Sequence, residues 1–317
     1  MKIIGELFSC VLFLTMTGTL FILPYGLLRS IVRKSSFFYK DVLCMIFFLV
    51  PILYPTLSMI SPEEPQWTSG YQAAAWIWAA GASASTVIYA FLTLFAYLRI
   101  RRMEACCDKK VLAIYEDLIR GKENPPVLLA GDIPFPIGIV GLFRPRIVLN
   151  PRLLEGLTDR QIYLVLLHEM THQKRGHLMI VKIMEVATIL HWFNPFIYLL
   201  KRWVAEDSEM DCDRFCTAGL QRTGTLREYT NALIRLVAVT DARPYAGTGQ
   251  LHATGYRAMD RRIRALFEHE RTHRGIPVRI AVILLALMVA VTALAISRTY
   301  FYPYPGLDLA ALSEEMS

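Results

Sequence analysis

Residues 159–173 read DRQIYLVLLHEMTHQ, and this stretch decides how the chain folds and which chemistry it can perform. It contains an H-E-x-x-H motif that runs from His168 to His172. The apolar residues in front of the motif are typical of a buried helix. Residues at i and i+4 lie on one face of a helix, so the two histidine side chains are expected to point the same way. This spacing is typical of two ligands to one metal ion.

The motif predicts zinc chemistry. Two imidazoles one turn apart can bind one Zn²⁺ at ~2.0–2.1 Å, and Glu169 between them can act as the general base that activates water for amide hydrolysis. The alternative is a structural helix that carries a short motif by chance. Thr158 and Gln161 favour the first interpretation, because they predict a capping box in front of an apolar, buried helix. Buried imidazoles and a buried carboxylate need partners, and a metal ion supplies one.

The composition is typical of a membrane protein. Of the 317 residues, 54% are hydrophobic and 19% are charged, with a net charge of +7. Four segments are long and apolar enough to cross ~30 Å of hydrocarbon. They are residues 3–28, 42–60, 73–98 and 278–297. The first is too long for a signal peptide and shows no convincing cleavage site, so it is expected to remain as an anchor.

Lysine and arginine predict the orientation, because cytoplasmic loops carry an excess of both. Basic residues follow the first and third segments, whereas the connection between the second and third has none. We therefore expect a multi-pass protein of the plasma membrane with external N- and C-termini and a cytoplasmic region over residues 99–277. The arginine-rich stretch 257–274 is expected to contact anionic lipid rather than nucleic acid.

These segments predict a mainly α membrane protein, in which about four transmembrane helices hold an inserted cytoplasmic α+β domain. Residues 1–98 are the predicted membrane domain with three helices, 99–277 the cytoplasmic domain, and 278–317 the fourth helix with a short external tail. Within the cytoplasmic domain, residues 103–121 are predicted to be an amphipathic helix, and residues 134–138 a loop.

Two further segments of this domain matter for the site. Ile147, Val148 and Leu149 are predicted to form an edge strand, because a preceding proline is tolerated at an edge. Residues 178–200 are long and apolar enough to suggest a fifth span, but Lys182 and Glu185 are costly in hydrocarbon. We therefore expect a buried or interfacial helix that ends near residues 192–195, followed by a second helix.

A catalytic zinc site needs a third protein ligand. In the acidic run 206–213, Glu209 can bind the metal, and Asp213, one turn later, can accept a hydrogen bond from a ligand histidine. On spacing alone, a solvated acidic helix face explains this run equally well. Cys212 and Cys216 have a spacing that can hold metal, but no second cysteine pair has zinc-finger spacing, and both are expected in the core.

Four motifs, in this order, resemble the cytoplasmic zinc domain of the integral-membrane beta-lactam sensor-transducers, the antirepressor peptidases. They are GLFRPRIVL at 141–149, HEMTH at 168–172, WFNP at 192–195 and EMDCD at 209–213. The resemblance implies a gluzincin-like site. In such a site His168, His172 and Glu209 bind one Zn²⁺, Glu169 is the general base, and Asp213 orients a ligand histidine. It also implies that the substrate is a transcriptional repressor or the peptidase itself.

The sequence departs from that family in two places. The sensor-transducers continue after the fourth membrane segment into an extracellular penicillin-binding domain, whereas this sequence ends soon after it, and no S-x-x-K motif follows it. Beta-lactam sensing by this chain alone is therefore not expected, and a separate sensor protein is a candidate partner. His177 stands where many relatives carry Asp. It is expected at the surface, with a role in orienting a ligand or binding substrate as the alternatives.

The leading hypothesis is a membrane-embedded zinc endopeptidase that cleaves a cytoplasmic or membrane-proximal protein in signal transduction. Its substrate is expected to add as a strand beside Ile147–Leu149. Two alternatives are a quality-control metallopeptidase with the same site and a non-catalytic receptor or scaffold, against which the intact motif argues. The expected partners are the protein substrate, the lipid bilayer and the sensor; no direct nucleic-acid binding is expected.

Overall fold

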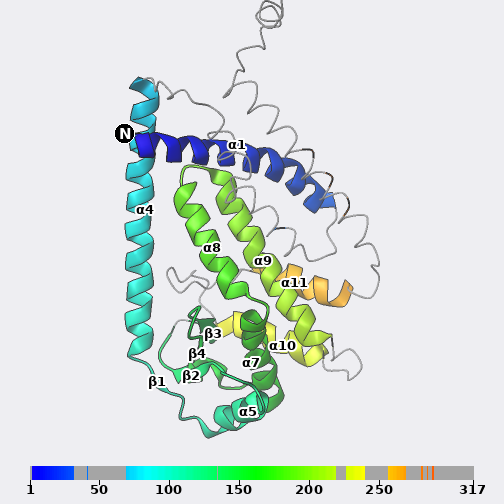
Figure 1. Cartoon of the computed structure of the whole chain (residues 1–317). Coiled ribbons are helices and arrows are strands. Elements are labelled where there is room, and N and C mark those ends of the chain that lie inside the picture. Colours follow the sequence, from blue (N-terminus) through cyan, green and yellow to red (C-terminus); the bar gives the residue numbers. More distant parts are fainter. Residues whose placement is uncertain are drawn as a thin grey trace, which may run out of the picture. The chain divides into compact units, whose positions relative to one another are not determined.

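The structure is a computed structural model, and it describes residues 2–31, 41, 69–133, 135–218, 226–239 and 256–268, with single positions at 280, 284 and 288 (Figure 1). The described part of the chain is mostly helical. Its contacts divide the chain into two compact units. One unit comprises residues 1–31, 44–79 and 274–317, and the other comprises residues 32–43 and 80–273.

The first unit contains helix α1 (Lys2–Ile31) and the first part of helix α4 (Ser69–Arg101). Both helices are long and apolar enough to cross a membrane, over Ile3–Leu27 in α1 and over the whole of α4. They coincide with two of the four predicted membrane segments. The second predicted segment, residues 42–60, and nearly all of the fourth, 278–297, lie outside the described residues.

The second unit contains a four-stranded sheet in the order β1-β2-β4-β3. Its strands are β1 (Glu104–Ala105), β2 (Val127–Ala130), β3 (Ile137–Val140) and β4 (Arg146–Leu149). β4 pairs in parallel with β2 and antiparallel with β3, so it is a central strand. The prediction that Ile147, Val148 and Leu149 form an edge strand is therefore wrong. Pro145 is tolerated because it precedes the strand and removes no hydrogen bond from the ladder.

The edge beside β4 is formed by β3, a strand that the sequence analysis assigned in part to a loop. Pro134, Pro136 and Gly138 suggested that loop, but only Gly138 lies within the strand. A tight connection joins β3 to β4 and requires glycine at its first position. Gly141 has φ +88°, and a Cβ there would lie 2.7 Å from the carbonyl oxygen of Arg144.

The helices that flank the sheet begin at strong N-caps. Helix α5 (Lys109–Ile119) begins after Asp108, whose side chain accepts bonds from two backbone amides. The predicted helix over 103–121 was therefore too long at its start, where β1 pairs with β2 instead. Helix α7 (Asp159–Lys174) begins at the predicted capping box of Thr158 and Gln161, which is confirmed.

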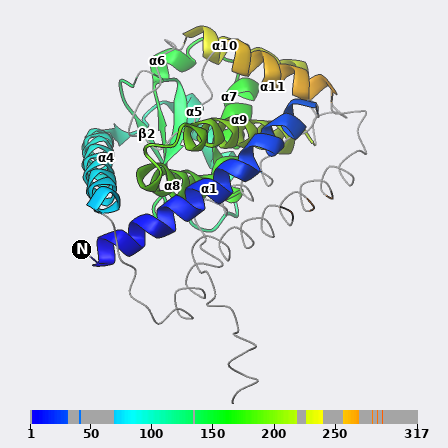
Figure 2. The same ribbon diagram turned by 90° about the horizontal axis from the view of Figure 1, so that it is seen from above.

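The remaining helices surround α7. The short α6 (Pro151–Leu154) precedes it, and α8 (His177–Leu190) and α9 (Pro195–Thr217) follow as an antiparallel pair (Figure 1). This confirms two helices in place of one continuous segment over residues 178–200. Helix α10 (Leu226–Val239) packs on α7, and α11 (Tyr256–Glu268) packs on α9 (Figure 2).

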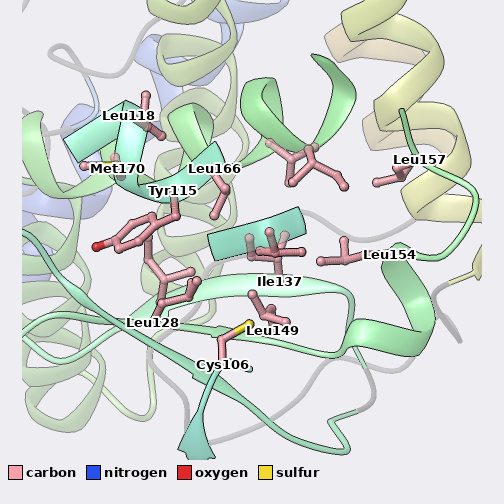
Figure 3. Packing of buried hydrophobic residues seen from close by; sticks show 14 of the residues in the cluster. Cys106, Tyr115, Leu118, Leu128, Ile137, Leu149, Leu154, Leu157, Leu166 and Met170 are labelled. Carbon is pink, nitrogen blue, oxygen red and sulfur yellow. The ribbon is translucent and has the colours of Figure 1, made fainter. Parts of the chain in front are cut away.

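The main hydrophobic core lies between the sheet, α5 and α7 (Figure 3). Leu166 and Met170 of α7 lie in this core beside Tyr115 of α5 and Leu149 of β4. Met170 is the first x of the H-E-x-x-H motif. One face of α7 is therefore anchored in the core, while the face with the histidines is held against α9.

Candidate metal centre

Helix α7 places two histidine rings next to each other. The Nε2 atoms of His168 and His172 lie 3.2 Å apart, and the two residues are 5% and 8% exposed. Burial lowers the pKa of His168, but its hydrogen bonds to the Asp213 carboxylate and to two further neighbours raise it well above its usual value. Two ring nitrogens at this distance in a buried site need a cation or a proton between them.

Glu209 on α9 completes a triangle of donor atoms with the two rings. Its Oε2 lies 3.3 Å from Nε2 of His168, and its Oε1 lies 3.5 Å from Nε2 of His172. Tetrahedral ligands at ~2.0–2.1 Å from a zinc ion lie ~3.3 Å from one another. The separations between the two ring nitrogens and from each of them to its nearer carboxylate oxygen fit that requirement, and two imidazoles with one carboxylate form a donor set that zinc uses in peptidases.

Cys212, one turn after Glu209, offers a competing donor. Its Sγ and one ring nitrogen each of His168 and His172 lie within 4.8 Å of one another. Burial, followed by the negative charge of Glu209, raises the pKa of the Cys212 thiol well above its usual value. A bound metal ion lowers the pKa of a coordinating thiol, so Glu209 and Cys212 are both candidates for the third ligand.

Glu169 is 3% exposed and is tied to the edge strand of the sheet. Its Oε2 accepts a 2.9 Å hydrogen bond from the backbone N–H of Ile139 in β3. That N–H therefore points away from β4 and toward α7. This hydrogen bond holds the Glu169 carboxylate, which belongs to the same helix as the two histidines, beside β3, the outer strand of the described sheet.

Tyr229 of α10 and Asp213 of α9 hold the other nitrogen of His168. Nδ1 of His168 lies 2.8 Å from the Tyr229 hydroxyl and 3.3 Å from Oδ1 of Asp213. The Tyr229 hydroxyl donates to Oδ1 of Asp213 at 2.6 Å, so its oxygen accepts from the Nδ1–H of a neutral His168. This tautomer leaves Nε2 unprotonated, as a metal ligand requires. Asp213 therefore orients His168 mainly through Tyr229.

Arg262 of α11 reaches this network from the far end of the described chain. Its Nε and Nη2 each donate to Asp213 at 2.7 Å, and its Nη1 lies 2.9 Å from Oε2 of Glu209. Burial raises the pKa of Asp213, but the charge and hydrogen bonds of Arg262 outweigh it and hold that pKa well below its usual range. The expectation that stretch 257–274 contacts lipid is wrong for Arg262, because this side chain is buried among acidic groups.

His177 holds His172 in a comparable way. It is 2% exposed, so the expectation of a surface histidine is wrong. Its Nδ1 lies 3.1 Å from Nδ1 of His172, and its Nε2 lies 3.3 Å from Oδ2 of Asp211. Asp211 in turn accepts hydrogen bonds of 2.7 and 3.0 Å from Arg175. The two alternatives for His177 were to orient a metal ligand or to bind substrate, and these contacts fit the first.

Sequence reasoning missed four groups of the site: the N–H of Ile139, the thiol of Cys212, and the side chains of Tyr229 and Arg262. Cys212 carried a usable signal, because Glu209, Cys212 and Asp213 share one face of a helix. Tyr229 and Arg262 lie in helices without a local motif, and only the packing of those helices brings them to the site.

Comparison with known proteins places these features in a family. A family described as BlaR1 peptidase M56 matches residues 41–266. Over 93 residues, 29% of this chain, the sequence is 31% identical to the methicillin resistance mecR1 protein of Staphylococcus aureus, of which the match covers 16%. It is 24% identical over 178 residues, 54% of this chain, to regulatory protein BlaR1 of Bacillus licheniformis, of which the match covers 29%. The matched regions thus span less than a third of these relatives. Since the family match extends over well more than half of the chain, the chain belongs to the BlaR1 peptidase M56 family, as the resemblance of its motifs predicted.

Proposed function

We propose that this chain is a membrane-embedded zinc endopeptidase with a single metal ion held by His168, His172 and Glu209. The proposal is supported most strongly by the two Nε2 atoms, which lie 3.2 Å apart, and by the Glu209 carboxylate, which has one oxygen within 3.5 Å of each of them. The family match adds that the chain is of a peptidase class. Tyr229 and His177 support it further, because each contacts the second ring nitrogen of one ligand histidine.

In this proposal Glu169 is the general base. When bound, zinc supplies a Lewis acid that polarises the scissile carbonyl and makes water easier to deprotonate. Glu169 takes the proton from the attacking water and passes it to the leaving amine. The N–H of Ile139 holds one carboxylate oxygen in place during these transfers, and the buried surroundings of Glu169 limit the access of bulk water.

The substrate is proposed to be an extended protein segment that adds to the free edge of β3. Because β4 is paired on both sides, β3 is the strand beside Glu169 whose outer edge can accept another chain. The relatives are named as a regulatory protein and a methicillin resistance protein, and these names support a signalling role. A transcriptional repressor or the chain itself is therefore the proposed substrate, with a separate sensor as a candidate partner.

Four transmembrane helices and a cytoplasmic α+β peptidase domain complete the proposal. The long apolar helices α1 and α4 support two of the four spans, and the basic residues after each support the orientation.

The test combines metal analysis with cleavage. The purified whole chain should hold about one Zn²⁺, and Glu169→Gln should retain zinc while cleavage of a repressor-type substrate or of the chain itself falls by at least ~10²-fold. The matched control is Glu116→Gln, a change at an exposed position of α5, which should leave both unchanged. A chain without zinc, or full cleavage by Glu169→Gln, would refute the proposal.

A further inference from the structure

We infer that α8 and the first part of α9, residues 177–200, insert into lipid hydrocarbon as a hairpin and return to the side from which they entered. The inference rests on the proposed membrane location of the chain and goes beyond the proposed peptidase activity. We call this segment the α8–α9 hairpin. Its two helices run antiparallel (Figure 1). His177 begins α8 and Glu209 lies in the later part of α9, so both lie away from the turn that joins the helices.

The outer surface of the α8–α9 hairpin is mainly apolar, with Lys182 as its partly exposed charged residue. Its six exposed residues are Met179, Val186, Phe193, Pro195, Tyr198 and Leu199. The one polar atom in these side chains, the hydroxyl of Tyr198, donates to the carbonyl of Trp192 at 2.9 Å. A helix in water shows polar residues on its exposed face. Helix α5 follows that rule, with Lys109, Lys110, Glu116 and Asp117 exposed.

Charged residues stand at the boundaries of this surface. Lys174 lies just before the hairpin and Arg202 just after it, and both are exposed. Inside the hairpin, Lys182 and Glu185 pair at 2.8 Å, so they add no net charge. The 14 residues of α8 rise by ~21 Å, which is less than the ~30 Å of hydrocarbon in a bilayer. The hairpin is therefore long enough to enter the bilayer and too short to cross it.

Several polar groups of the turn at the tip bond within the hairpin. The N–H of His191 donates to the carbonyl of Ala187 at 3.0 Å, and the N–H of Asn194 donates to the carbonyl of His191 at 2.8 Å. The side chain of Asn194 accepts from the N–H of Phe196 at 2.9 Å. Hydrocarbon offers no hydrogen-bond partners, so internal bonds of this kind lower the cost of inserting the turn.

Helix α4, a candidate membrane span, gives an independent measure of depth. The ring of Trp192, at the tip of the hairpin, lies on Gly81, where an added Cβ would be 2.2 Å away. Lower on the same helix, the hydroxyl of Tyr89 accepts a 3.1 Å hydrogen bond from Lys201. Gly81 lies ~12 Å along α4 from Tyr89, the partner of Lys201 at the base of the hairpin. With that base at the membrane surface, the tip lies ~12 Å inside the hydrocarbon.

The inference also places the metal centre at the membrane surface. His177 begins α8 at the base of the hairpin, and Glu209 lies beyond Arg202 on α9, outside the apolar segment. A substrate must then present its cleavage site next to the bilayer.

The test measures depth in the whole chain, in vesicles of phosphatidylcholine and phosphatidylglycerol. Nitroxide labels are attached to Val186→Cys and Phe193→Cys, with Lys174→Cys and Arg202→Cys as the matched boundary positions. The background carries Cys107→Ser, because Cys107 is exposed, and its residual signal is subtracted. Collision with oxygen reports lipid, and collision with a water-soluble nickel chelate reports water.

The labels at Val186 and Phe193 should collide readily with oxygen and several-fold less with nickel than the label at Lys174. The labels at Lys174 and Arg202 should meet nickel added to the same side of the bilayer. Nickel access at Val186 and Phe193 equal to that at Lys174 would overturn the inference, as would Lys174 and Arg202 on opposite sides. Exclusion of both reagents would mean that a protein surface covers the hairpin, which also overturns it. None of these readouts depends on zinc or cleavage, so a failed peptidase proposal would be visible separately.

Discussion

Arg262 donates two 2.7 Å hydrogen bonds to Asp213, and through them a helix near the end of the described chain supports the ring of a proposed metal ligand. The same guanidinium lies 2.9 Å from Glu209. The metal centre is thus built from α7 and α9 but completed by α11.

Replacing Arg262 should destabilise the protein strongly. In Arg262→Met, Asp213 and Glu209 lose a buried cation, and breaking a buried pair in this way costs ~3–5 kcal/mol. Thermal unfolding of the whole chain in detergent measures the loss. Arg264→Met is the control, because Arg264 pairs with Asp260 at the surface, and that exposed pair should contribute less than ~1 kcal/mol. Equal losses in the two variants would contradict the buried network.

Glu209 and Cys212 compete as the third metal ligand, and single substitutions separate them. Glu209→Ala should lose most of the bound zinc, whereas Cys212→Ala should retain about one ion per chain. Metal analysis after dialysis gives the result. Glu206, which lies in the same acidic run and pairs with Arg202 at 2.9 Å and with Arg261 at 2.5 Å, is the next candidate if Glu209→Ala keeps its zinc. Zinc loss in Cys212→Ala with zinc retained in Glu209→Ala would reverse the assignment.

Removing the hydroxyl of Tyr229 should weaken metal binding without unfolding the chain. Tyr229→Phe keeps the ring in the core but removes the group between His168 and Asp213, and losses of this kind reduce metal affinity by ~10–100-fold. Competition with a zinc chelator measures the affinity. Tyr163→Phe, a change on the same helix as the motif but outside the hydrogen-bond network described above, is the control. An unchanged affinity in Tyr229→Phe would show that the hydroxyl does not orient His168.

The N–H of Ile139 can be tested with proline. Ile139→Pro removes the donor to Glu169, but this N–H points away from β4, so the sheet keeps its bonds. Cleavage should fall by ~10–10²-fold, because a small displacement of a catalytic group has a large effect on rate, while zinc content stays the same. Gly138→Pro is the contrasting variant. Its N–H faces β4 by strand alternation, and it should lower the melting temperature instead. Normal cleavage by Ile139→Pro would remove Ile139 from the site.

Reporter fusions test the orientation. A reporter after Lys110 should read cytoplasmic, and reporters at Pro65 and Ser317 should read external, because lysine and arginine are concentrated beside the predicted inner ends. If the Ser317 fusion reads cytoplasmic, the four-span arrangement fails.

Local signals were sufficient for part of this molecule. The capping box at Thr158, the histidine spacing on α7 and the break at Asn194 and Pro195 all depend on residues within a few positions of one another, so the sequence predicted them. The order of the strands is not local. Pro145 suggested an edge, but β2 and β3 pair with β4 from distant positions, and no pattern within residues 146–149 records that pairing.

The site shows the same limit. His168, His172 and Glu209 could be proposed as ligands because metal ligands need regular spacing on helices, which the sequence displays. Tyr229 and Arg262 were missed because their roles arise only when α10 and α11 pack beside α7 and α9. A run of arginines looks the same in sequence whether its members face lipid or, as Arg262 does, lie buried between carboxylates.

The two positions that the H-E-x-x-H motif leaves variable, Met170 and Thr171, each make defined contacts in this protein. Met170 is 8% exposed and sits in the core, and the hydroxyl of Thr171 donates to the carbonyl of Leu167 at 2.8 Å. The Thr171 hydroxyl also lies 3.7 Å from the Cys216 sulfur of α9. The contacts of Met170 and Thr171 with neighbouring elements favour one rotation of the helix about its axis, and that rotation directs both imidazoles. Transfer of this site to another scaffold therefore requires the residues that pack against the helix as well as His168, Glu169 and His172.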